Sequence, residues 1–289
     1  MNKQAPTTQT TITDPPTAEP TTALASIDEG GFKALAMLDG GPSLADILHK
    51  NLGIAGLTFN DFKAADFPAG GGTFWTVPNM DAPNGVEAMN ELCGIIVLAQ
   101  DTRRFYREKK GAGEENIPPN CWSPDGISGY GDPGGLCERC PMDKWNSDTG
   151  GGRGKACKQR KQLLLLPRDE RLPLAIDLPP ASLSTFKSYA MNLSSQGMFL
   201  CQCETGISLK KMEKGGNTYA VAQFRRVCVL GAEDAVAAAA YADAMEKIVM
   251  LQAGDDTAPM VSERTELSEP PAGLSTAPVD AEDPFGANE

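Results

Sequence analysis

Residues 91–108 have the sequence ELCGIIVLAQDTRRFYRE, whose centre is a continuous run of apolar and β-branched side chains. Such a run is typical of a strand buried within a sheet, although a helix could also be drawn through it. We interpret it as the first long strand of the fold. The cysteine-containing segment that follows is polar, and apolar runs resume only at residue 162.

The segments on either side of this strand give an ordered series of elements. We expect a helix over 44–52 between Ser43 and Gly53, a strand at 73–77, a hairpin from runs 162–167 and 171–179, a helix before Gly197, a second hairpin around 215–217, and an alanine-rich helix over 232–252. The strand at 91–108 and the two hairpins make five strands, with a helix between the third and the fourth. This order predicts a mainly β protein with some helix, built as a five-stranded OB-like barrel.

Four cysteines, Cys121, Cys137, Cys140 and Cys157, lie in the insertion after the first strand. The loop that contains them is rich in Gly, Asp, Ser and Pro, so it buries too little apolar surface to offset the entropy of its own ordering. Four thiolates around one zinc ion would hold it, with Cys137 and Cys140 as the paired ligands and the outer two at its base. The sequence therefore predicts a structural zinc site within residues 117–161.

Other interpretations of these cysteines stay open. An iron–sulfur cluster also takes four thiolates, and a C-x2-C pair can occur without any metal. Disulfides are disfavoured, because the N-terminus has no apolar signal segment and we expect a reducing cytoplasm. The remaining cysteines, Cys93, Cys201, Cys203 and Cys228, lie in apolar runs and are typical of small core residues.

The charge of −12 is unevenly distributed along the 289 residues. Residues 254–289 carry nine acidic side chains against one basic side chain, whereas residues 31–253 are nearly neutral and contain basic clusters. We expect disordered tails over 1–30 and 254–289 and one folded core over 31–253. No apolar run is long enough to span a membrane. The basic clusters indicate a polyanionic partner.

The whole series resembles the zinc-containing single-stranded DNA-binding proteins of phages and related mobile elements. The similarity rests on the stretch CWSPDGISGYG…GLCERCPMDKWNS…GRGKACKQRKQLLLLP, on the OB-like order of strands, and on the acidic tail. It covers about residues 90–230. The resemblance implies sequence-nonspecific binding of single-stranded DNA during phage DNA replication or recombination, with zinc in a structural role.

A protein of this kind holds phosphates with basic side chains and stacks bases on aromatic ones. The candidate phosphate contacts are Arg103, Arg104, Arg107, Arg153, Lys155, Lys158, Arg160, Lys161, Lys210, Lys211, Arg225 and Arg226. The candidate stacking residues are Phe105, Tyr106, Trp122, Trp145, Tyr219 and Phe224. Strand alternation places Tyr219 and Phe224 on opposite faces, so only one of them should face DNA.

The tail sequence DAEDPFGANE is similar to the acidic tips through which bacterial single-strand binders recruit replication or recombination proteins. The matching residues are Asp280, Glu282, Asp283, Pro284 and Phe285. Four residues follow the Phe here, which argues against capture through a terminal carboxylate. A solvated acidic segment is the alternative.

No catalytic constellation is evident in the sequence. The single histidine, His49, lies in an expected amphipathic helix, and the glycines at 150–154 do not have phosphate-loop spacing. We therefore expect no enzyme activity. Two other binding functions remain as alternatives, namely a zinc-knuckle adaptor between proteins and a recombination mediator or annealing protein.

Overall fold

A computed structural model describes residues 31–35, 44–53, 57–107, 117–148 and 153–250. The described chain is mainly strand with some helix. The helices are α1 (Leu44–Leu52), α2 (Leu183–Ser195) and α3 (Ala232–Met250). The strands are β1 (Ala64–Ala65), β2 (Trp75–Pro78), β3 (Val86–Met89), β4 (Glu91–Phe105), β5 (Cys121–Ser123), β6 (Ser128–Gly131), β7 (Gly135–Leu136), β8 (Lys158–Leu166), β9 (Leu174–Leu178), β10 (Cys203–Lys214) and β11 (Asn217–Val229).

Nine of these strands form one mixed sheet that does not close on itself. Its main body has the order β11–β10–β4–β8–β9–β1, with β1 parallel to β9 and the other neighbours antiparallel. A closed five-stranded barrel is therefore not confirmed. The outer edge of β9 pairs with Ala64–Ala65, and among the described residues β11 pairs only with β10.

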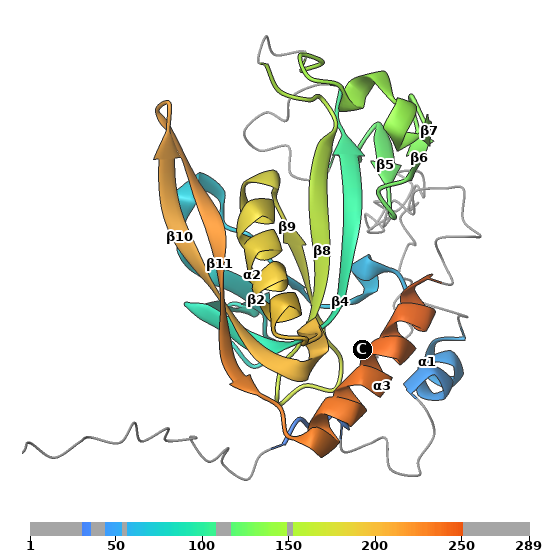
Figure 1. Cartoon of the computed structure of the whole chain (residues 1–289), viewed down its shortest axis with the longest axis vertical. Coiled ribbons are helices and arrows are strands. Elements are labelled where there is room, and N and C mark those ends of the chain that lie inside the picture. Colours follow the sequence, from blue (N-terminus) through green and yellow to red (C-terminus); the bar gives the residue numbers. More distant parts are fainter. Residues whose placement is uncertain (1–30, 36–43, 54–56, 108–116, 149–152, 251–289) are drawn as a thin grey trace, which may run out of the picture.

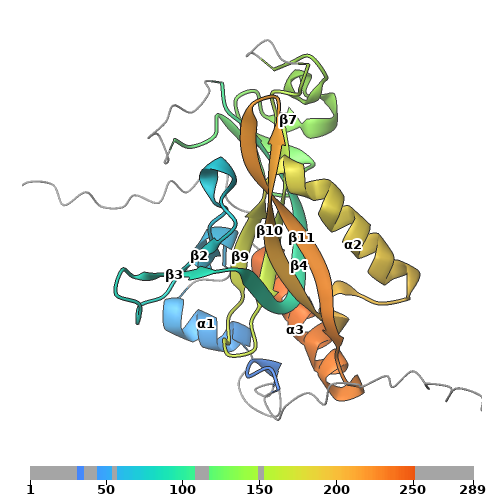
Figure 2. The same ribbon diagram turned by 90° about the vertical axis from the view of Figure 1, so that its left-hand side faces the viewer.

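Both faces of this sheet are buried at its centre. On β8, Leu163 and Leu165 point into one hydrophobic core, while Leu164 and Leu166 point into a second core. Helix α2 packs in the first core with the β10–β11 hairpin, and α3 packs in the second (Figures 1 and 2). Two buried faces explain why the run at 163–166 is apolar at every position instead of at every second one.

The first core is closed by aromatic side chains from three elements. Trp75 of β2 is fully buried and donates a hydrogen bond from Nε1 to the carbonyl oxygen of Ile207, 2.9 Å away. Phe224 of β11 stacks on Tyr189 of α2 with 5.7 Å between ring centroids. The half of the β10–β11 hairpin that is distant from its turn is thereby packed against α2.

Most of the expected elements are confirmed. The strand over 91–105, both hairpins, and the helices at 44–52, 183–195 and 232–250 are present, and Gly53, Gly197, Gly215 and Gly216 have the positive φ that their stop or turn positions require. The expected strand at 73–77 lies at Trp75–Pro78 and pairs with β3, a strand that the sequence pattern did not predict. The tails over 1–30 and 254–289 and the cap at Ser43 lie outside the described residues. Among the described helices, none combines the length and the apolar character needed to cross a bilayer.

Gly94 offers a test of the central sheet, because β4 lies between β8 and β10 there. A Cβ atom at this position would lie 2.4 Å from the carbonyl oxygen of Leu166. We expect Gly94→Ala to lower the free energy of unfolding by about 1–3 kcal/mol, the usual cost of overpacking. Urea denaturation followed by circular dichroism measures this. Gly31→Ala is the control, since a Cβ atom there would have no other atom within 4 Å, and an equal loss of stability would contradict the argument.

Candidate metal centre and nucleic-acid interface

The cysteine loop forms a small unit at the end of the β4–β8 pair. Strand β5 begins at Cys121, which pairs with Phe105 at the end of β4, and Cys157 directly precedes β8. Strands β6 and β7 and two short helical turns, Cys137–Arg139 and Pro141–Asp143, lie between them. The expectation that the outer two cysteines stand at the base of the loop is confirmed.

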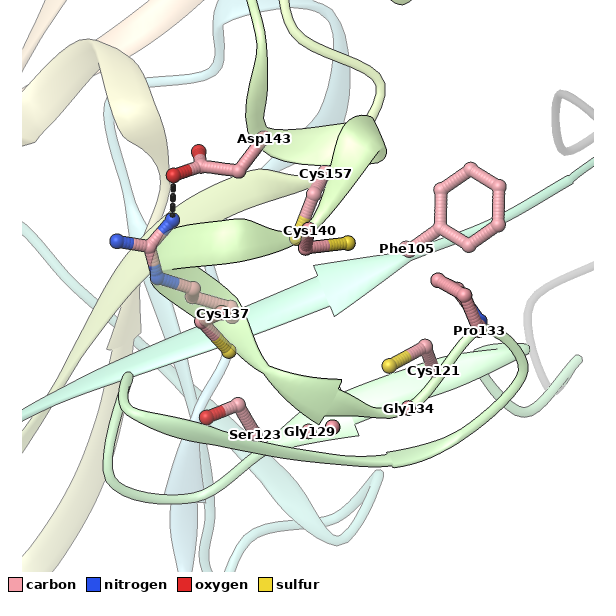
Figure 3. A pocket seen from close by; sticks show the side chains of 12 residues that line it. Phe105, Cys121, Ser123, Gly129, Pro133, Gly134, Cys137, Cys140, Asp143 and Cys157 are labelled. Carbon is pink, nitrogen blue, oxygen red and sulfur yellow. Dashed lines mark ion pairs between the residues drawn. The ribbon is translucent and has the colours of Figure 1, made fainter.

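All four cysteines of the loop line one cavity (Figure 3). The cavity has a volume of about 10 Å³, close to that of one water-sized sphere. Gly129 lies beside it, and a Cβ atom there would be 3.0 Å from Cys121 Sγ and 3.8 Å from Cys137 Sγ. A side chain at Gly129 would therefore fill the space between these two sulfur atoms.

The sulfur atoms do not form a finished coordination shell. Among the described residues, no three His, Cys, Asp or Glu side chains lie close enough together to hold a metal ion. Burial raises the pKa of Cys157 to about 12, and burial also raises the pKa of Cys121, although a backbone hydrogen bond from Gly134 opposes that rise. A metal ion that binds these thiols would displace their protons. That the four cysteines are ligands of one metal ion remains a prediction, and all four line the same cavity.

An ion-pair network supports one wall of this cavity. The Arg103 guanidinium lies 2.6 Å from Asp143, and Lys155 lies 3.0 Å from the other carboxylate oxygen of Asp143. Burial acts to raise the pKa of Asp143, but the hydrogen bonds from Lys155 and Arg103 outweigh it, so the pKa is lowered overall. Arg103 and Lys155 are thus part of the framework of the loop, and Asp143 offsets one of their two positive charges.

The predicted phosphate contacts do not lie along one groove. Strand alternation places Arg103 and Lys161 on one face of the β4–β8 pair and places Arg104, Lys158 and Arg160 on the other. Many of these cations also have a carboxylate within ion-pair distance. The pairs are Arg104 and Arg160 with Asp177, Arg107 with Asp132, Lys158 with Asp148, Lys161 with Asp101, and Arg225 with Glu91.

A smaller group of basic side chains is exposed. Lys210, Lys211 and Arg153 have no carboxylate within ion-pair distance among the described residues. Arg226 is also exposed and donates to Gln196 Oε1 at 2.7 Å. Lys214, at the end of β10, joins this group. Much of the uncompensated positive charge therefore lies near the turn of the β10–β11 hairpin.

The six candidate stacking residues separate by burial. Phe105 is 3% exposed beside the cysteine cavity, and Phe224 packs in the first core, so neither ring is open to a base. Trp122 is half-buried and packs near Tyr130, and Tyr106 is half-buried at the end of β4. Trp145 is 73% exposed, with the Lys155 ammonium 5.9 Å from its ring centroid.

Tyr219 lies on the face of the hairpin opposite to the core. It pairs with Met212, whereas the core-facing pairs are Ile207 with Phe224 and Leu209 with Ala222. Its diagonal neighbours across the strands are Lys210 and Lys214. The expectation that Tyr219 and Phe224 occupy opposite faces is confirmed.

The sequence analysis did not predict that Asp143 pairs with Arg103 and Lys155, or that Arg103 and Arg104 lie on opposite faces of the sheet. Asp143 is three residues after Cys140, and an acidic residue this close to the cysteines could have indicated an ion pair within the loop. Alternation along 103–104 and 158–161 could likewise have divided the basic cluster between two faces. The predicted partner-binding residues Asp280, Glu282, Asp283, Pro284 and Phe285 lie outside the described residues.

The chain was compared with known protein families, with curated proteins and with solved structures, and none of the three comparisons found a match. What the chain can do must therefore be inferred from the geometry of its own residues.

Proposed function

We propose that the protein binds single-stranded DNA without sequence preference and that a structural zinc ion holds its cysteine loop. Phage DNA replication or recombination is the setting that the resemblance implies. The proposal requires no catalytic group, only exposed aromatic faces with cations beside them. The observation that carries it is the exposure of Trp145 next to Lys155.

Trp145 has the features of a stacking platform. Its ring is largely exposed, Lys144 precedes it, and the carbonyl oxygen of Arg153 accepts a hydrogen bond from the next residue, Asn146. One cation, the half-buried Lys155, therefore lies at the exposed ring, and the exposed residues Lys144 and Arg153 are near it along the chain or through the backbone. Stacking of this kind tolerates every base, because every base has a π face, and it contributes about 1–3 kcal/mol per base.

The β10–β11 hairpin offers a second platform of the same composition. Tyr219 lies between Lys210 and Lys214 on the exposed face of a hairpin whose turn extends beyond the core. The hairpin turn and the cysteine loop both lie at the upper end of the molecule (Figures 1 and 2). We propose that a single strand crosses this end and contacts both platforms.

The cysteine cavity supports the zinc part of the proposal. It has room for about one small ion among four sulfur donors, and Arg103 is close enough to act on the charge of Cys137 and Cys157. A tetrathiolate site carries excess negative charge, which a neighbouring guanidinium offsets. The zinc would order the loop that presents Trp145.

The strand order supports a relationship to the expected barrel. Strands β4, β8 and β9, then α2, then β10 and β11 follow the OB-like series, and β1 pairs with β9 at the edge of the open sheet. We propose that the core is an open variant of that barrel.

Metal content tests the zinc site. We expect about one zinc ion per chain by elemental analysis, because four thiolates fill one tetrahedral shell. Cys140→Ser should lose the metal and make the loop sensitive to proteases, whereas Cys93→Ser, on β4 outside the cavity, should keep it. Iron with visible absorption would favour the cluster instead, and a metal-free protein with an ordered loop would contradict both.

Trp145→Ala tests the stacking platform. Titration of the protein with fluorescent oligo-dT at low salt should show tight binding. A single strand of mixed sequence should bind with the same affinity. We expect the variant to bind about 5- to 150-fold more weakly, because it loses one base stack. Phe199→Ala is the matched control, since Phe199 is 72% exposed and lies between α2 and β10. Equal losses in both variants, or no binding by the wild type, would refute the proposal.

Lys210 and Lys214 can be tested by salt dependence. The double variant Lys210→Gln, Lys214→Gln should reduce the slope of log K against log salt concentration by about 0.7 for each phosphate that the protein no longer neutralises. Lys50→Gln, on exposed α1, should leave the slope unchanged. An unchanged slope in the double variant would contradict the proposed contact between the hairpin and the DNA strand.

A further inference from the structure

A cavity of about 370 Å³ lies between the edge of the main sheet and the segment that leads into β1. Its polar wall lies on the face of the sheet against which α3 packs, beyond the part that α3 itself contacts. Asp177 is two residues from Ala175 on β9, and Ala175 belongs to the core that contains α3, so alternation puts both on that face. The cavity is lined by other residues than the hairpin surface that carries Tyr219.

The polar wall of the cavity consists of two arginines held by one carboxylate. Arg104 Nη1 lies 2.9 Å from Asp177 Oδ2, and Arg160 Nε lies 2.8 Å from Asp177 Oδ1. Arg160 Nη2 also donates to the Asp177 carbonyl oxygen at 3.2 Å. A guanidinium carries five N–H donors, so both arginines keep donors for another oxyanion.

Two further properties of this wall favour an anionic group. The three side chains are about three-quarters buried, at 25%, 24% and 23% exposure, so their electrostatic interactions are less screened than those of surface pairs. Two guanidinium groups with one carboxylate leave one positive charge. A phosphate that bridges Arg104 and Arg160 would meet this positive charge at the wall, whereas the carboxylate of Asp66 lines the exposed edge of the cavity.

The rest of the lining includes two aromatic rings, Phe59 at the edge of the second core and Phe67 edge-on to Trp75 in the first core. Phe59 and Phe67 are partly buried at the cavity, and the small side chains of Ala64 and Ala175 leave its floor open. Asp66 and Asn60 line the exposed edge and can accept hydrogen bonds from an amino or hydroxyl group. The volume lies within the range of about 300–1,000 Å³ that is usual for small-molecule sites.

We infer that this cavity binds a nucleoside monophosphate group, with the phosphate on Arg104 and Arg160 and the base between Phe59 and Phe67. The group could belong to a free nucleotide or to the 5′-phosphorylated end of a DNA strand, since both present the same chemistry. The inference does not depend on the proposed path of a strand over Trp145 and Tyr219, because the two sites use different residues.

Calorimetric titration of the full chain with thymidine 5′-monophosphate, thymidine and inorganic phosphate tests the inference. We expect the monophosphate to bind more tightly than either component alone. No binding at millimolar monophosphate, or equal binding of thymidine, would overturn it. The source is decided by comparing oligo-dT with and without a 5′-phosphate. If the 5′-phosphate tightens binding of the strand beyond the affinity of the free monophosphate, the cavity belongs to strand ends. If the 5′-phosphate does not change the affinity of the strand, the cavity belongs to free nucleotides.

Two variants locate the site. Arg160→Gln should weaken binding of the monophosphate about tenfold to a hundredfold, the loss expected for a charge-assisted hydrogen bond. Ala64→Leu fills the cavity from an exposed position without removing a charge, and it should have a similar effect. Both variants should bind unphosphorylated oligo-dT with the affinity of the wild type. Trp145→Ala should bind the monophosphate with the affinity of the wild type. Unchanged monophosphate binding in both cavity variants would overturn the assignment.

Discussion

The pairing of β4 with β8 is the constraint on which the rest of the structure depends. These strands lie at the centre of the open sheet and are buried on both faces, so each supplies side chains to two separate cores. Helix α2 with the β10–β11 hairpin packs on one side, and α3 packs on the other. A sheet buried on both faces needs no barrel closure to protect its centre, although its edges still have to be covered or paired.

The same pair of strands also carries the cysteine loop. The loop leaves from the end of β4 and returns at the start of β8, and Arg103 of β4 fixes it through Asp143. This ion pair is mostly buried, so breaking it would leave a poorly solvated charge beside the cavity. A bound metal would therefore act on a loop that the sheet already orients. Trp145 lies on that loop and would be ordered with it.

Charge in this protein is largely compensated where it is dense. The cations from 103 to 107 and from 155 to 161 have acidic partners, so the basic clusters of the sequence are mainly networks of ion pairs. Exposed cations without a carboxylate partner in the described residues occur at Lys210, Lys211 and Lys214 and beside Trp145. Because Arg104 and Arg160 share one carboxylate, one positive charge of this pair also stays without a carboxylate partner among the described ion pairs.

The sequence by itself determined the long strands, the three helices and the hairpin turns, because apolar runs, alternation and glycines act over short distances. It also placed four cysteines in one loop that lacks a core of its own. It did not determine the short strands β1, β3, β5, β6 and β7. It did not determine whether the sheet closes, since Ala64–Ala65 reaches β9 from more than 100 residues away. Nor did it determine which cations are neutralised. Asp143, Asp177 and Glu91 meet their arginines only after distant strands pair, and a carboxylate's partner depends on distance in space and not along the chain.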